Sequence, residues 1–276
     1  MSSILTNSSA MNALATLKDV NRGLNDTQSR VSTGLKVASG KDNAAYFAVS
    51  ETMKGDSGMF KAINEGMTAT KNSVATARLG AETVTDIAQQ IVERIAFAQT
   101  DGVDRNDVQK EITALAANML TVINQSTFNG NSLVDSTDSV EVVNGVKRTA
   151  TGIEASSYTF SEVDLVTIQS EFAAYNVTTP TDAAGRKAQL AAAEVSLGKS
   201  IDAATSLGIT ENALDSQMQF VESLTDTLDS GVSSMVDADM EEEAARLQAY
   251  QVQQQLATQS LSIANQAPQN ILSLFR

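Results

Sequence analysis

One long apolar seam limits what this chain can fold into. Between Phe60 and Ala98, apolar residues recur at alternating spacings of three and four, and only Thr70 interrupts them with a polar side chain. This is the spacing of a helix that packs against another helix along one continuous stripe. At 1.5 Å per residue the seam is about 57 Å long. That length favours a rod over an ordinary helical bundle.

The rest of the chain also favours long helices. Stripes with the same spacing cover residues 108–122, 190–207 and 214–235. The last two are expected to belong to one helix, with a disturbance at Gly208. The chain has only two prolines, Pro180 and Pro268, so few helix breakers interrupt it. The fold class predicted is mainly α: a coiled-coil rod in which the N- and C-terminal halves pack together, with a small β-containing central segment.

The two ends of the chain carry leaner stripes that are rich in alanine. The N-terminal stripe contains Ala10, Ala13, Leu17, Val20, Leu24, Thr27 and Val31. The C-terminal stripe contains Ala245, Ala249, Val252, Leu256, Gln259 and Ile263. Residues 1–17 and 250–275 have no charged side chain, whereas the later part of the N-terminal arm is basic and residues 237–243 are acidic. This charge pattern predicts antiparallel contact between the arms.

Several boundaries are predicted by local signals. Asp104 is expected to cap the helix that follows it, and Asn129–Gly130 is expected to end that helix. The alternating stretch around Asn144–Gly145 predicts a two-residue β-hairpin turn there. Residues 150–180 stay open: "SYTF" and "VDLVTI" fit strands, and "QSEFAAYN" fits a helical turn.

Two further boundaries are expected on either side of the rod. Thr181 or Asp182 is expected to cap a later helix. Residues 34–42 are expected to form a turn between helices, with Gly34 or Gly40 in an unusual backbone conformation.

Composition excludes most enzyme chemistry. The chain has no Cys and no His, which removes thiolate and imidazole catalysis and most zinc sites. We therefore expect no enzyme activity, no metal and no cofactor. A net charge of −14 disfavours a nucleic acid partner. No apolar run is long enough to span a bilayer, and no cleaved secretory signal is visible, so insertion into a membrane is not expected.

Both ends of the chain resemble bacterial flagellin. Residues 4–53 are similar to its N-terminal region and residues 236–276 to its C-terminal region. The closest fragments are "STGLKVASGKDNAA", "STFNGNSLV" and "ANQAPQNILSLFR". Two separate ends that match in the same order are a much stronger signal than one motif. The N-terminus is similar in style to alphaproteobacterial flagellins.

The resemblance implies a division into three regions. Residues 1–40 and 237–276 would form an inner coiled-coil core domain. Residues 41–134 and 183–236 would form a helical rod domain. Residues 135–182 would be a short variable outer segment that contains a β-hairpin.

The resemblance also implies a function. The chain would be a structural subunit that polymerises into the helical flagellar filament, the extracellular propeller of bacterial motility. Its partners would be copies of itself in an open helical homopolymer, sister flagellins, the flagellar export apparatus, an export chaperone, and the filament cap and junction proteins. Export would leave no cleaved signal peptide behind.

Large apolar residues near both ends are expected to pack in the filament core, between neighbouring copies. They are Leu5, Leu14, Leu17, Leu24, Val31, Leu256, Leu261, Ile263, Ile271, Leu272, Leu274 and Phe275. Burial inside the chain itself is the alternative for several of them. For Leu17 and Leu24 the two interpretations are equally good.

Two other functions compete with that of the filament subunit. A hook–filament junction protein would share the helical ends, but "PQNILSLFR" favours flagellin. A cytoplasmic coiled-coil signalling adaptor would explain the heptads but not the charge-free ends. The segment "QQIVERIAFAQ" at 89–99 departs from the family's receptor-recognised segment, so weak or absent activation of the Toll-like receptor for flagellin is expected. Glycosylation, helical symmetry, handedness and mixing with other flagellins are left open by the sequence.

Overall fold

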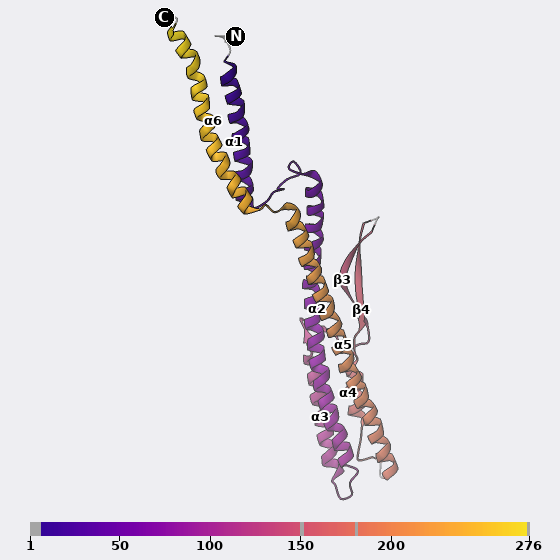
Figure 1. The fold of residues 1–276 in the computed structure, drawn as a ribbon. Helices are drawn as coiled ribbons and strands as arrows, with labels where there is room; N and C mark the ends of the chain where they lie inside the picture. The colour runs from indigo at the N-terminus through magenta and orange to yellow at the C-terminus, as the bar shows by residue number, and fades with distance from the viewer. Residues whose placement is uncertain (1–6, 150–151, 180–181, 275–276) are drawn as a thin grey trace. The chain divides into compact units, whose positions relative to one another are not determined.

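The computed structural model describes residues 7–149, 152–179 and 182–274, and of residues 267–274 it describes the backbone alone (Figure 1). The helices are α1 (Ser8–Thr33), α2 (Ala44–Phe97), α3 (Arg105–Gln125), α4 (Leu165–Ala174), α5 (Ala183–Val236) and α6 (Met240–Leu274). The strands are β1 (Thr127–Phe128), β2 (Asn131–Ser132), β3 (Ser139–Thr149) and β4 (Gly152–Ser161). The expected fold class is confirmed: long helices from both halves of the chain, with small β-hairpins in the centre.

The chain divides into two compact units. One unit contains residues 1–57 and 227–276, and the other contains residues 58–226. Helices α2 and α5, each 54 residues long, supply residues to both units. Neither helix has a break, so α5 runs through Gly208 without the expected disturbance.

In the unit formed by residues 58–226, the predicted seam is the buried face of α2. Met67, Val74 and Ile91 on that face are fully enclosed. Helix α3 packs closely on α2 because Gly80 has no side chain: a Cβ at that position would collide with the side chain of Ser126. Asp104 caps α3 as predicted, since its carboxylate accepts from the backbone N–H of Asn106 at 2.9 Å.

Helix α4 settles part of the region that the sequence left open. "SYTF" lies in β4, but "VDLVTI" is not a strand, because α4 begins at Leu165. Asp164 is its N-cap and accepts from the backbone N–H of Thr167 at 2.8 Å. Asp182 caps α5 by accepting from the backbone N–H of Gly185 at 3.3 Å.

Neither Asn-Gly pair has the role predicted for it. Helix α3 ends at Gln125, and Asn129–Gly130 forms the turn between β1 and β2, with φ of 53° and 79°. Two successive positive φ angles are what a two-residue hairpin turn requires. Asn144–Gly145, predicted as a turn, instead lies inside β3 at a β-bulge. Gly145 is buried there, and β3 continues past it to Thr149.

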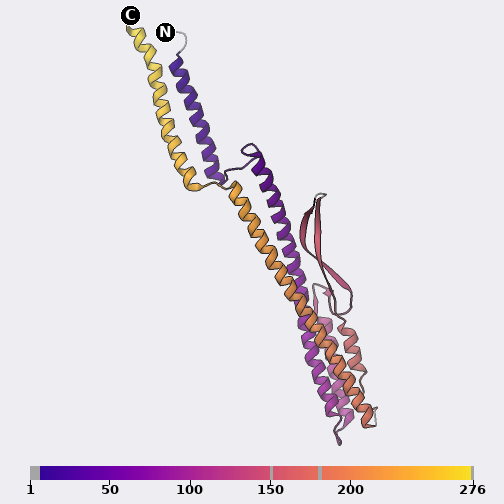
Figure 2. The same cartoon turned by 45° about the vertical axis from the view of Figure 1, so that its right-hand side comes forward.

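In the other unit, α1 and α6 lie side by side and antiparallel, as Figures 1 and 2 both show. Gly34 ends α1 with a φ of 73°, a left-handed conformation that favours glycine. Just beyond, the backbone N–H of Lys36 donates to the Val236 carbonyl at 2.6 Å, and that of Ala238 donates to the Gly34 carbonyl at 2.9 Å. We call residues 34–38 and 236–238 the joint. Val37, Val232 and Val236 form an apolar cluster at the joint.

Candidate assembly surfaces

Polar contacts fix the register between α1 and α6. Arg30 donates to the Glu243 carboxylate at 3.2 Å, near the joint. Further along, Gln254 donates to the Asn21 side-chain oxygen at 2.6 Å. Near the far end, the Asn7 amide donates to the Ala264 carbonyl at 2.8 Å. The predicted antiparallel contact between a basic and an acidic arm is therefore confirmed at the Arg30–Glu243 pair.

Glu243 stands out within this contact because it is a buried carboxylate. Its side chain is only 6% exposed, and Arg246 adds a second guanidinium at 3.5 Å. Arg30 and Arg246 both approach the same carboxylate oxygen. A buried charge is tolerated when it is paired in this way.

The face of α6 that meets α1 is not the stripe described from the sequence. The inward side chains are Glu243, Leu247, Tyr250, Gln254, Ala257, Leu261 and Ala264, again with three-four spacing. The predicted stripe from Ala245 to Ile263 is exposed, offset by two residues and thus by about 200° around the helix. Val252, Leu256 and Ile263 on it are 56%, 60% and 64% exposed.

A close contact explains which face of α6 turns inward. The ring of Tyr250 lies directly against Gly23 of α1, so close that a Cβ on that glycine would be 2.6 Å from the ring. The exposed face of α6 has no aromatic residue, so it has no ring that could pack against Gly23 in this way. We call Ala245, Ala249, Val252, Leu256, Gln259 and Ile263 the outer stripe of α6.

The residues predicted for the filament core fall into three groups. Leu17, Leu24, Val31 and Leu261 are partly buried where α1 and α6 meet. Leu14, Leu256 and Ile263 are exposed. Ile271, Leu272 and Leu274 lie in α6, where only the backbone is described, and Leu5 and Phe275 lie outside the described residues.

The sequence reasoning missed exposed apolar residues on the unit formed by residues 58–226. Leu79 on α2 and Ile201, Ile209 and Phe220 on α5 are all exposed. Of these, only Ile201 lies on a predicted stripe. Large apolar residues at positions outside the seams were the signal that could have revealed this surface, because a rod that works alone would carry polar residues there.

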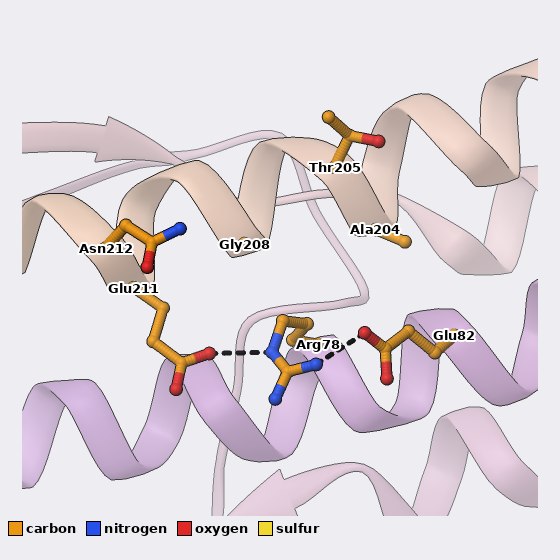
Figure 3. A pocket seen from close by; sticks show the side chains of 7 residues that line it. All are labelled: Arg78, Glu82, Ala204, Thr205, Gly208, Glu211 and Asn212. Carbon is orange, nitrogen blue, oxygen red and sulfur yellow. Dashed lines mark hydrogen bonds and ion pairs between the residues drawn. The ribbon is translucent and has the colours of Figure 1, made fainter.

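A groove runs between α2 and α5 (Figure 3). Its volume is about 480 Å³, and its lining residues are Arg78, Glu82, Ala204, Thr205, Gly208, Glu211 and Asn212. The Arg78 guanidinium donates to Glu211 at 2.6 Å and also to Glu82. These two carboxylates, Glu211 more strongly, raise the pKa of Arg78 above its ordinary value.

The described residues contain neither a metal-binding cluster nor a membrane-spanning helix. No group of three or more Asp, Glu, His or Cys side chains among them could hold a metal ion. None of the helices, as far as they are described, is long and apolar enough to cross a membrane. What the molecule presents instead is long helices with apolar and polar contact surfaces.

Such an arrangement, with paired terminal helices and apolar stripes left exposed, is that of a structural protein built for assembly. The chain matches the family models for the bacterial flagellin N-terminal helical region over residues 4–139 and the bacterial flagellin C-terminal helical region over residues 190–275. It is 36% identical to a flagellin of Brucella melitensis, with all of both chains covered. It is 31% identical to a flagellin of Caulobacter vibrioides, with 100% of this chain and 99% of the relative covered.

The chain therefore belongs to the bacterial flagellin family, and its relatives are alphaproteobacterial. It is a non-enzymatic subunit of the extracellular flagellar filament, polymerises with copies of itself and serves motility. Its fold is also similar to a solved structure described as a flagellar hook-associated protein of Vibrio parahaemolyticus. That match has a TM-score of 0.53 at 11% identity, and covers 71% of this chain and 100% of the other.

Proposed function

We propose that the two terminal arms, residues 1–40 and 237–276, form the inner core of the filament. In this proposal residues 41–134 and 183–236 form the rod outside it, and residues 135–182 are the outer segment. Within the inner core, neighbouring copies pack through Leu5, Leu14, Leu256, Ile263, Ile271, Leu272, Leu274 and Phe275. Leu17, Leu24, Val31 and Leu261 support the same core from inside each α1–α6 pair.

The observation that carries this proposal is the outer stripe of α6. It repeats the three-four spacing of a packing face, yet no described residue of the chain covers it. Burying one large aliphatic side chain stabilises an assembly by about 1.5–3 kcal/mol. Since residues 250–275 carry no charge, burial of this face leaves no unpaired ion behind. A neighbouring copy gains from covering it without that cost.

Substitutions on the two faces of α6 test the proposal. Leu256→Ser and Ile263→Ser on the outer stripe should leave the thermal unfolding of the monomer unchanged, because both side chains are exposed there. They should prevent filament growth, measured by electron microscopy and sedimentation. Leu247→Ser on the inward face is the matched control, and it should lower the stability of the monomer itself. Normal filaments from the Leu256→Ser, Ile263→Ser double variant would contradict an inner core made by this stripe.

We further propose that the chain leaves the cell through the flagellar export apparatus, with an export chaperone, a filament cap and junction proteins as its partners. The absence of cysteine supports passage of an unfolded chain, because no disulfide can hold it folded beforehand. Secretion of the chain should stop in cells that lack the export apparatus. Undiminished secretion from such cells would exclude this route.

A further inference from the structure

The outer half of the β3–β4 hairpin has no buried side chain among its described residues. Val142, Gly145 and Phe160 are buried at the base of the hairpin. Beyond Gly145, no described residue of β3 or of its partners up to Ser157 is buried. A two-stranded hairpin is marginally stable at best in water. We call residues 146–149 and 152–157 the ribbon end.

One face of the hairpin is apolar although it is open to solvent. Cross-strand pairs place Val146 opposite Ala155, and Arg148 opposite Ile153, on the same face as Val143. Val143 and Ile153 are 44% and 48% exposed. The ribbon end is also basic, because it carries Lys147 and Arg148 against the single acid Glu154.

The groove of Figure 3 has the opposite character. Glu82 and Glu211 outnumber Arg78, so its net charge is negative. The groove is open on the side of α5 because Ala204 and Gly208, which line it there, have little or no side chain.

Exposed apolar residues lie close to the lining residues along both helices. Leu79 follows Arg78, Ile209 follows Gly208, and both are exposed. Ile201 lies about one helical turn before Ala204 on α5, and it is exposed as well. The groove thus offers acids with exposed apolar residues next to them in the sequence, which is complementary to a hairpin face that combines apolar residues with one arginine.

We propose that the ribbon end of one copy docks in the α2–α5 groove of a second copy. Arg148, which lies on the same face as Val143 and Ile153, would then be near Glu82, and the apolar side chains of that face would lie against Leu79, Ile201 and Ile209. The ribbon does not fill its own groove. Gln217 of α5 donates to the Asn144 carbonyl at 3.1 Å, which holds the hairpin at its bulge. In Figures 1 and 2 the strands run from there away from the N-terminal end of α5.

This contact joins two different surfaces, so it can repeat along a filament without closing on itself. It rests on the self-polymerisation of the family and is independent of the terminal arms. It would also cover the apolar face of the hairpin and the α2–α5 groove, two surfaces that the described residues of one chain leave exposed.

A charge exchange in the full-length chain tests the contact. Arg148→Glu alone and Glu82→Lys alone should each raise the critical concentration for filament growth about tenfold, because each places like charges together. The double variant, which carries both changes, should return to within about twofold of the wild type. Rescue of this kind is not expected from two changes that act only inside the monomer, where Glu82 pairs with Arg78 and Arg148 lies opposite Ile153.

A second variant and a control make the result decisive. Ile153→Ser changes no charge and should raise the critical concentration about tenfold through lost apolar burial. Lys110→Glu makes the same charge change as Arg148→Glu at an exposed site on α3, and it should assemble as the wild type does.

Three results would overturn the proposal: normal assembly of either single charge variant, failure of the double variant to recover, or equal loss in Lys110→Glu. None of these results would affect the proposal for the terminal arms, which is tested separately by the substitutions on the outer stripe of α6.

Discussion

At the scale of the residue, glycines decide where the helices of this chain can touch. Gly23 accepts the ring of Tyr250, and Gly80 accepts the side chain of Ser126. In both places a methyl group would occupy space that the partner already fills. Other helical glycines, such as Gly55, have nothing within 4 Å of the position that a methyl group would take, and they only weaken their helix. The same residue type therefore has opposite roles at different positions.

This contrast gives a paired prediction. Gly23→Ala should destabilise the α1–α6 pair by about 1–3 kcal/mol, because the Tyr250 ring must move away from its contact. Gly55→Ala should stabilise α2 by up to about 1 kcal/mol, because alanine favours a helix and meets nothing there. Chemical denaturation of the full chain, followed by circular dichroism, measures both changes. Equal effects of the two substitutions would contradict the close packing of Tyr250 on Gly23.

At the scale of the element, the sequence predicted the helices better than their faces. The seam of α2 is buried as predicted, and the stripe of α1 faces α6, because there the only apolar stripe is the packing stripe. Helix α6 has two stripes of equal spacing, and spacing alone does not distinguish them. The choice depends on how Tyr250 fits Gly23, which is a tertiary contact.

The two Asn-Gly pairs show a similar limit for turns. Both have the composition of a hairpin turn, yet only Asn129–Gly130 adopts positive φ angles. Asn144–Gly145 stays in the ladder because Gly145 is buried opposite Ser156 and Gln217 binds the Asn144 carbonyl. The groove between α2 and α5 was not predicted from the sequence, since it is formed by Arg78 and Gly208 from two helices that are far apart in the chain.

The contact of Glu171 with α5 predicts that the attachment of α4 to α5 depends on pH. Glu171 of α4 accepts from Lys199 and from Ser196 of α5, and Tyr175 also contacts the Ser196 hydroxyl at 2.8 Å. Lys199 first, and Ser196 second, lower the pKa of Glu171 below its ordinary value. A lowered pKa stabilises the fold above the unfolded-state value, about 4.3, and the contribution is lost as the pH falls through the folded-state pKa.

In the Glu171→Gln variant, the free energy of unfolding should therefore depend less on pH in the acid range. Between about pH 5 and pH 3, the free energy of unfolding should fall less in this variant than in the wild type. Urea denaturation at a series of pH values measures the difference. Asp42, whose pKa is lowered chiefly by its hydrogen bonds with Ser39, is unchanged in the variant and supplies remaining acid sensitivity. Parallel curves for the two proteins would show that Glu171 does not hold α4 in this way.

At the scale of the whole molecule, the chain is a filament subunit whose packing surfaces exceed what one copy can cover. The family and its function were accessible from the two ends of the sequence, and the domain matches agree with them. The two ends of the chain are connected at the joint, where residues 34–38 meet residues 236–238 from the opposite half of the chain. Its hydrogen bonds run from main chain to main chain.

A proline substitution should therefore disrupt the joint where an alanine substitution does not. Lys36→Pro removes the N–H that donates to the Val236 carbonyl at 2.6 Å, whereas Lys36→Ala keeps it. The loss should cost about 0.5–1.5 kcal/mol in the free energy of unfolding. Denaturation of the two variants in parallel measures it. If both were equally stable, the backbone contact at Lys36 would not matter.

Because these hydrogen bonds join main-chain atoms, the side chains of Lys36 and Ala238 are not needed to make them. Gly34, in its left-handed conformation, and the valine cluster are the places in the joint where the side chain matters. Substitutions at Lys36 or Ala238 that keep the backbone N–H should therefore leave the two halves of the chain attached, whereas a bulky residue at Gly34 or a polar one at Val37 should loosen them.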